Sequence, residues 1–149
     1  MRTHAHIYKL HDRCSNNQAE QVAIQKALEQ LRQLPITDDK AKTIVVNTDS
    51  RVALDTLRNR KKHNILIENT KKEIKRLEDL QWTVIFNWVK AHAGTQGNEM
   101  ADRLAKEAAA EDTEEIVYNK IPRETIITEG KEDELSKCRD SGQVLTKEQ

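Results

Sequence analysis

Apolar residues recur with the period of a strand in some segments and with the period of a helix in others over residues 5–110. Three short segments have the alternating or β-branched pattern of a strand: 5–10, 43–48 and 82–89. Four longer segments have apolar residues at helical spacing: 16–34, 52–59, 65–80 and 98–110. Ser15 and Gln18 form a capping-box pattern at the start of the first helix. Strands that alternate with helices predict an α/β layered domain.

The pattern changes after Ala110. Residues 111–149 lose the helical period and carry 11 Asp and Glu against 6 Lys and Arg, whereas residues 1–110 carry 14 against 19. Segment 116–127 keeps some apolar character around Pro122, but the last twenty residues have the composition of a weakly structured tail. We therefore expect a globular domain over 1–110 and an acidic, partly disordered C-terminal extension over 111–149.

Composition and cysteine usage narrow the class of protein. Leu, Ile, Val and Phe number 33 of 149, above the roughly 20% at which disorder becomes the better prediction. Cys14 and Cys138 have neither the spacing of a zinc site nor that of a disulfide framework. There is no apolar signal-peptide core and no apolar run of the roughly 18 residues that span a bilayer. These features predict an intracellular protein, nuclear or cytoplasmic, with no membrane partner.

Three carboxylates stand where a buried acidic site could form. Glu20 shares a predicted helix face with Ile24. Asp49 directly follows a buried strand, and Asp102 lies one helical turn after Asn98. Each has an ordinary explanation as well: a partly exposed Glu near a helix start, an Asp that caps the next helix, and the solvated edge of an amphipathic helix. Residue by residue, the pattern leaves both interpretations open.

The neighbours of these carboxylates carry a family resemblance. Three segments resemble ribonuclease H motifs, in the order of that family: Asn16-Asn17-Gln18-Ala19-Glu20, Thr48-Asp49-Ser50, and Trp88-Val89-Lys90-Ala91-His92-Ala93-Gly94 continued by Gly97-Asn98-Glu99-Met100-Ala101-Asp102. Two further segments, 9–15 and 118–122, are similar to parts of the ribonuclease H domain near the end of non-LTR retrotransposon reverse transcriptase polyproteins. The resemblance covers roughly residues 3–122.

The resemblance implies a chemistry and a substrate. It implies that Glu20, Asp49 and Asp102 ligate two Mg²⁺ ions, with Mn²⁺ as an alternative, for hydrolysis of the RNA strand of an RNA/DNA hybrid. It implies that His92 shuttles protons during product release. Contacts to the hybrid are implied for six residues: Asn16, Asn17, Gln18, Ser50, Lys90 and Asn98. Without the resemblance, His92 is typical of a surface histidine and 15–18 of a helix cap.

One feature of the family is missing from this sequence. Ribonuclease H domains begin with a strand whose Asp, usually in an Asp-Gly-Ser context, bridges both ions, and the sequence contains no Asp-Gly-Ser. We therefore expect an α/β ribonuclease H-like fold that lacks its first two strands, followed by the acidic C-terminal tail. The strand near Ile7 would be separated from the strand near Val45, and the edges left behind would be unpaired and apolar.

Three functions remain open at this point. The first is an RNA/DNA hybrid endoribonuclease, with little or no activity for this chain alone because the bridging carboxylate is absent. The second is a catalytically inactive nucleic-acid-binding remnant of a retroelement. The third is a non-catalytic product whose acidic tail contacts other proteins. If the chain is a fragment of a longer protein, an upstream reverse transcriptase segment is an expected partner.

Overall fold

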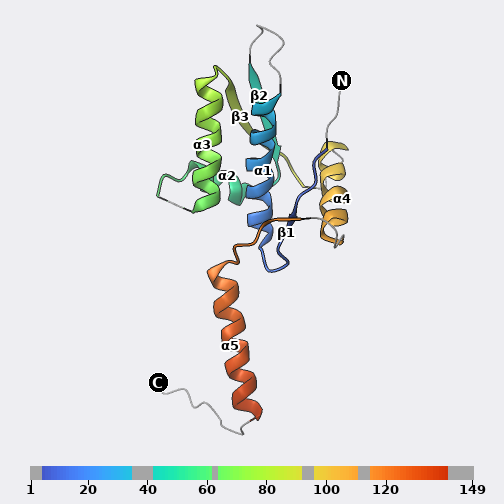
Figure 1. Ribbon diagram of the computed structural model, residues 1–149, viewed down its shortest axis with the longest axis vertical. Helices are drawn as coiled ribbons and strands as arrows, with labels where there is room; N and C mark the ends of the chain where they lie inside the picture. The colour runs from blue at the N-terminus through green and yellow to red at the C-terminus, as the bar shows by residue number, and fades with distance from the viewer. Residues whose placement is uncertain (1–4, 35–41, 62–63, 92–95, 111–114, 141–149) are drawn as a thin grey trace.

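A computed structural model describes residues 5–34, 42–61, 64–91, 96–110 and 115–140 (Figure 1). Its helices and strands, in chain order, are β1 (Lys9–Leu10), α1 (Asn16–Gln33), β2 (Thr43–Thr48), α2 (Arg51–Arg58), α3 (Ile65–Asp79), β3 (Thr83–Trp88), α4 (Gln96–Ala110), β4 (Ile116–Tyr118) and α5 (Arg123–Asp140). The alternation of strands and helices confirms the α/β class predicted from the sequence.

The central sheet consists of β2 and β3, which run parallel. Their register pairs Thr43 with Thr83 at one end and Thr48 with Trp88 at the other. A hydrogen bond from the Val89 N–H to the Thr48 carbonyl (2.9 Å) closes the ladder at the carboxyl end. This end of β2 leads directly into Asp49, so the sheet fixes the backbone on which that carboxylate stands.

A second two-stranded sheet pairs β1 with β4, also in parallel, with an irregularity between Lys9 and Leu10. Among the described residues, β1 and β2 belong to different sheets, as the sequence led us to expect. The strand β4 occupies one edge of β1, a pairing that the sequence pattern did not predict. The predicted strand over 5–10 shortens to Lys9–Leu10, since only these residues have a strand partner.

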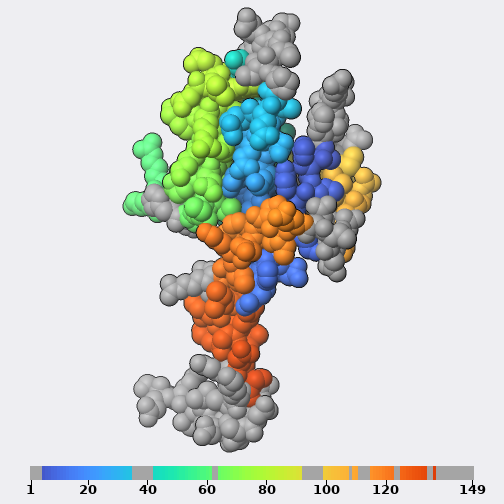
Figure 2. Space-filling view, viewed as in Figure 1, coloured from blue at the N-terminus to red at the C-terminus, as the bar shows by residue number. Residues whose placement is uncertain are grey.

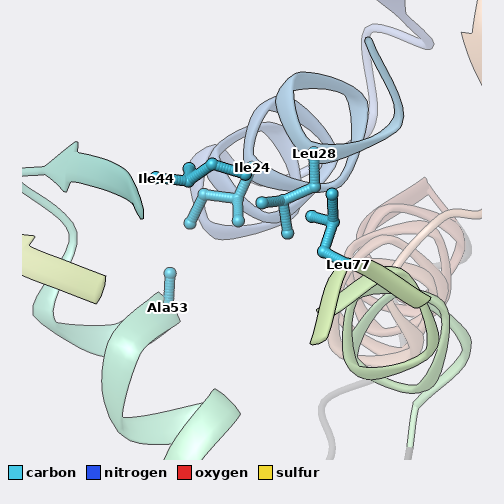
Figure 3. Close-up of a cluster of buried hydrophobic side chains, with 5 residues drawn as sticks. All are labelled: Ile24, Leu28, Ile44, Ala53 and Leu77. Carbon is cyan, nitrogen blue, oxygen red and sulfur yellow. The ribbon is translucent and has the colours of Figure 1, made fainter. Parts of the chain in front are cut away.

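The core lies between the central sheet and the helices on one of its faces. Ile24 and Leu28 of α1, Ile44 of β2, Ala53 of α2 and Leu77 of α3 form one buried cluster (Figure 3). Leu28 and Leu77 have no exposed surface, so each contributes about 1.5–3 kcal/mol by burial. Figure 1 shows α1 and α3 side by side over this sheet.

An ion-pair network also links α1 to α3. The carboxylate of Glu73 is only 6% exposed and accepts a hydrogen bond from Arg32 Nε (3.1 Å). Arg76, one turn further along α3, pairs with the other oxygen of the same carboxylate. Because an unpaired charge is costly to bury, the two guanidinium groups make the burial of Glu73 tolerable.

The alanines of α1 lie on a different face from the core. Ala19, Ala23 and Ala27 recur at helical spacing, yet all three are exposed. Ala19 and Ala23 line a cavity of about 580 Å³ that is also lined by residues of β1 and α4, including Leu10 and Leu104. Apolar residues therefore recur at helical spacing on two faces of α1, but only the face with Ile24 and Leu28 belongs to the core cluster.

The helix α5 projects from the rest of the molecule, beyond β4 (Figures 1 and 2). Arg13 Nε donates a hydrogen bond to Glu129 Oε1 (2.9 Å), which ties α5 to the turn before α1. The apolar pattern does not predict this helix, because its apolar residues do not gather on one face; Ile126 and Ile127 are both exposed. The boundary between 110 and 111 remains a prediction, although β4 beyond it pairs with β1. In the parts of the chain that are described, none of the helices has the length and apolar character needed to cross a membrane.

Candidate active site

Asp49 stands between the end of β2 and the start of α2. The hydroxyl of Ser50 accepts a hydrogen bond from the Ala53 N–H (3.1 Å), so Ser50 is the N-cap of α2. The alternative that Asp49 caps this helix is therefore wrong. Asp49 is half-buried at the carboxyl edge of a parallel sheet, the edge at which ligands gather in α/β proteins.

Glu20 lies in the second turn of α1, opposite the end of β2. Its side chain is half-buried, and Thr48 Oγ1 donates a hydrogen bond to Glu20 Oε2 (3.4 Å). Burial raises the pKa of Glu20, and the negative charge of Asp49 raises it further. The hydrogen bond from Thr48 lowers this pKa, while the charge of Asp102 raises it. Glu20 is thus a partly exposed glutamate near a helix start whose pKa is raised by burial and by a neighbouring carboxylate.

Asp102 lies on α4 and is half-buried. Because its charge acts on the pKa of Glu20, the structure brings carboxylates from α1, the end of β2 and α4 into one electrostatic neighbourhood. The charges of Asp49 and Asp102 both disfavour the ionised form of Glu20, and a cation beside Glu20 would relieve this repulsion. The sequence placed them together only through the family resemblance.

Carboxylate oxygens are the donors that hard divalent cations such as Mg²⁺ prefer, so the chemistry of these side chains fits such an ion. Their spacing in this structure is wider than coordination requires. Within the described ranges, no three His, Cys, Asp or Glu side chains lie close enough together to hold a metal ion. Additional ligands or a closer approach of the carboxylates would complete a site.

The residues implied to contact nucleic acid are distributed around this region. Asn16 and Asn17 are exposed in the first turn of α1, and Lys90 is exposed just after β3. Gln18 is engaged within the protein, since its amide accepts from the Ser15 N–H (2.9 Å) and donates to the Lys120 carbonyl (2.9 Å). The capping box predicted at Ser15 is therefore confirmed.

Two of the predicted site residues cannot be placed. His92 lies outside the described residues. Asn98 belongs to α4, but its side chain is likewise outside the described part of the structure.

Sequence reasoning missed three side chains around Asp49. Thr48 contacts Glu20, as described above. The indole N–H of Trp88 donates a hydrogen bond to the Asp49 carbonyl (3.0 Å). The Arg51 guanidinium stacks over the Trp88 ring, 4.1 Å from its centroid. Because Thr48 and Trp88 end paired strands, their position at the edge of the sheet was a usable signal.

Comparison with known proteins assigns the family. Residues 1–110 match the RNase H family model, which covers more than half of the chain. The chain therefore belongs to the ribonuclease H family, as its motifs indicated. It is also similar to a protein from Jannaschia sp. (strain CCS1) named Ribonuclease H, with 34% identity over 107 residues. This match covers 64% of each protein, so the chain spans somewhat less than two thirds of that relative's length.

Proposed function

We propose that the chain is an RNA/DNA hybrid endoribonuclease module that uses two divalent metal ions, Mg²⁺ or Mn²⁺. Membership of the ribonuclease H family supports the substrate class. The observation that carries the proposal is the electrostatic coupling of Glu20 to Asp49 and Asp102, which come from three separate elements. A carboxylate with a raised pKa beside another carboxylate at the carboxyl edge of a sheet is characteristic of functional sites.

The proposed role of these carboxylates is to hold the cations and orient the scissile phosphate. Glu20, Asp49 and Asp102 would each supply oxygen ligands. When bound, two such ions activate the attacking water and stabilise the leaving oxygen of a phosphodiester. The hydrogen bond from Thr48 favours the ionised form of Glu20, the form that binds a cation. His92 is proposed to carry protons at the end of the reaction, as its motif implies.

The proposed hybrid contacts fall into two chemical types. Asn16 and Asn17 are exposed amides at a helix start, suited to hydrogen bonds with 2′-hydroxyl groups in the minor groove. Lys90 is an exposed cation near the carboxyl end of the sheet, suited to phosphate. Gln18 and Ser50 also have capping roles, so substitutions there would affect folding as well as binding.

A second candidate function is hybrid binding without turnover. The sequence contains no Asp-Gly-Ser segment. Among the described residues, no three carboxylates lie close enough together to hold a metal ion. With fewer carboxylates as ligands, less of the repulsion between two divalent cations is offset. We therefore propose that these 149 residues alone cleave slowly or not at all.

A retroelement origin, with an upstream reverse transcriptase segment as partner, is also proposed. It rests on the sequence resemblance of segments 9–15 and 118–122. These two segments contact each other, since the His11 N–H donates a hydrogen bond to the Tyr118 carbonyl (2.9 Å). The first two strands and the bridging carboxylate of the family would then belong to the longer protein.

The experiment uses a labelled RNA/DNA hybrid with Mg²⁺ or Mn²⁺, and measures binding and cleavage separately. Asp49→Asn tests the site, and Asp55→Asn, an exposed carboxylate on α2, is the matched control. Cleavage that Asp49→Asn abolishes and Asp55→Asn preserves would establish the nuclease and refute the proposal of inactivity. Salt-sensitive binding to the hybrid without cleavage would establish the second candidate. If the chain neither binds nor cleaves the hybrid, both candidate functions are contradicted.

A further inference from the structure

The backbone between β2 and α2 changes direction within two residues, Asp49 and Ser50. The last hydrogen bond of the strand ladder reaches the Thr48 carbonyl, and the first of the helix reaches the Ser50 carbonyl, from the Leu54 N–H. The Asp49 carbonyl lies between these two acceptors along the chain. A side chain, Trp88, supplies a donor to it (3.0 Å).

We propose that Trp88 is a positioning residue for the Asp49 carboxylate. The bond from its indole N–H fixes the peptide that follows Asp49, and the Ser50 N–H is held in turn by Thr48 Oγ1 (3.1 Å). With both groups of this peptide restrained, the backbone from which the Asp49 side chain projects is held in place. The inference rests on the proposed function, in which Asp49 ligates a cation.

Burial does not explain Trp88. The residue is 43% exposed at the end of β3, whereas the other tryptophan, Trp82, is half-buried and packs against the core cluster. An indole placed for its apolar surface would be covered to a greater extent. Its polar atom, by contrast, makes a hydrogen bond of normal length to the backbone beside a candidate ligand.

Arg51 completes the arrangement from the other side. Its guanidinium lies 4.1 Å from the centroid of the Trp88 ring, which restricts rotation of an exposed indole. Arg51 is also the first residue of α2. The helix that begins after Asp49 therefore carries the side chain that restrains Trp88. We accordingly assign Arg51 a supporting role through Trp88.

The first test needs no metal. Backbone ¹⁵N relaxation is measured for wild-type protein, Trp88→Phe and Trp82→Phe; Phe keeps a ring but removes the indole donor. We expect the order parameters of Asp49 and Ser50 to fall in Trp88→Phe from about 0.85 to below about 0.6, and to remain high in Trp82→Phe. Order parameters in α1 and α3 should not change. Rigid Asp49 and Ser50 amides in a folded Trp88→Phe protein would overturn the proposal.

A second pair of variants keeps the test decisive if Trp88→Phe fails to fold. Arg51→Met removes the stacking charge but leaves the indole, and Arg58→Met, also exposed on α2, is its control. Greater mobility of Asp49 and of the Trp88 indole in Arg51→Met alone is expected. Equal mobility of Asp49 and Trp88 in Arg51→Met and Arg58→Met would contradict the supporting role of Arg51 and the positioning role of Trp88.

A cation titration separates this proposal from the proposed function. In the Trp82→Phe background, Mn²⁺ bound at Asp49 should quench the emission of Trp88. Arg51→Met should weaken that binding roughly tenfold, as loss of an outer support of a metal ligand typically does. Absence of Mn²⁺ binding in all proteins would refute the proposed function while the relaxation data still decide the role of Trp88. Mn²⁺ binding that Arg51→Met does not weaken would overturn the positioning role of Trp88.

Discussion

Thr48 donates a hydrogen bond to the carboxylate of Glu20 (3.4 Å), joining the last residue of β2 to the second turn of α1. The same hydroxyl accepts from the Ser50 N–H (3.1 Å). Since Thr48 is 5% exposed, it has little contact with solvent. One buried hydroxyl therefore connects two segments that carry candidate metal ligands.

Replacing this hydroxyl tests the connection. Thr48→Val preserves shape and β propensity but removes both hydrogen bonds, so we expect a loss of about 1–2 kcal/mol in the free energy of unfolding. The pKa of Glu20 should rise further, because the bond that favours its ionised form is gone. Urea unfolding and an NMR titration of Glu20 measure the two effects. Thr43→Val, on the exposed face of the same strand, is the control and should change neither.

The raised pKa of Glu20 predicts a pH dependence of stability. Its folded pKa lies above the ordinary value of 4.5, so the folded state binds its proton more tightly than the unfolded state does. The stabilisation by this group is fully present below about pH 4.5 and is lost as pH rises through the folded pKa. Stability measured as wild type minus Glu20→Gln should therefore decrease with rising pH. A difference that is flat or increases would refute the raised pKa.

The core cluster predicts a large effect at Leu28. This side chain has no exposed surface and lies beside Ile24 and Leu77 in the buried cluster (Figure 3). Leu28→Ala should lower the free energy of unfolding by about 2–5 kcal/mol, measured by urea denaturation. Leu34→Ala, at a position 52% exposed, should cost less than about 0.5 kcal/mol. Similar losses for both variants would show that the helices do not pack as described.

The buried carboxylate of Glu73 predicts a contrast with an exposed ion pair on the same helix. Glu73→Ala removes a 6% exposed carboxylate that Arg32 and Arg76 both contact, so we expect a loss of about 1.5–3 kcal/mol. Asp79→Ala breaks the exposed pair with Lys75 and should cost about 0–1 kcal/mol. Thermal unfolding in low and high salt compares the two. An equal effect of both substitutions would contradict the importance of burial.

Much of the fold follows from local sequence. The β-branched run 43–48 became β2 with the predicted bounds, but the prediction of a buried strand is wrong. Helices cover one face of β2, and on the other face Val45 is 50% exposed. The cap at Ser15 was equally readable, since both of its hydrogen bonds lie within four residues. The length of β1 was not readable from 5–10, because it depends on a partner about a hundred residues away.

The site divides in the same way. The motifs identified Glu20, Asp49 and Asp102, but not the support around them. Ser50 rather than Asp49 caps α2 because the helix begins at Arg51. The sequence pattern does not fix the start of a helix to within one residue. The bond from Trp88 to the Asp49 carbonyl depends on the register of β2 and β3, which no local pattern contains. The helix α5 could not be predicted from apolar spacing, because its residues favour a helix but do not form an apolar face.

The central proposal is that Glu20, Asp49 and Asp102 together bind a divalent cation, through additional ligands or a closer approach than this structure shows. Mn²⁺ is titrated into the wild-type chain and into Glu20→Gln, Asp49→Asn, Asp102→Asn and the control Asp55→Asn, with binding followed by calorimetry. We predict that each of the three site variants weakens binding roughly tenfold or more while the control matches the wild type. Wild-type affinity in the site variants, or an equal loss in Asp55→Asn, would contradict the claim.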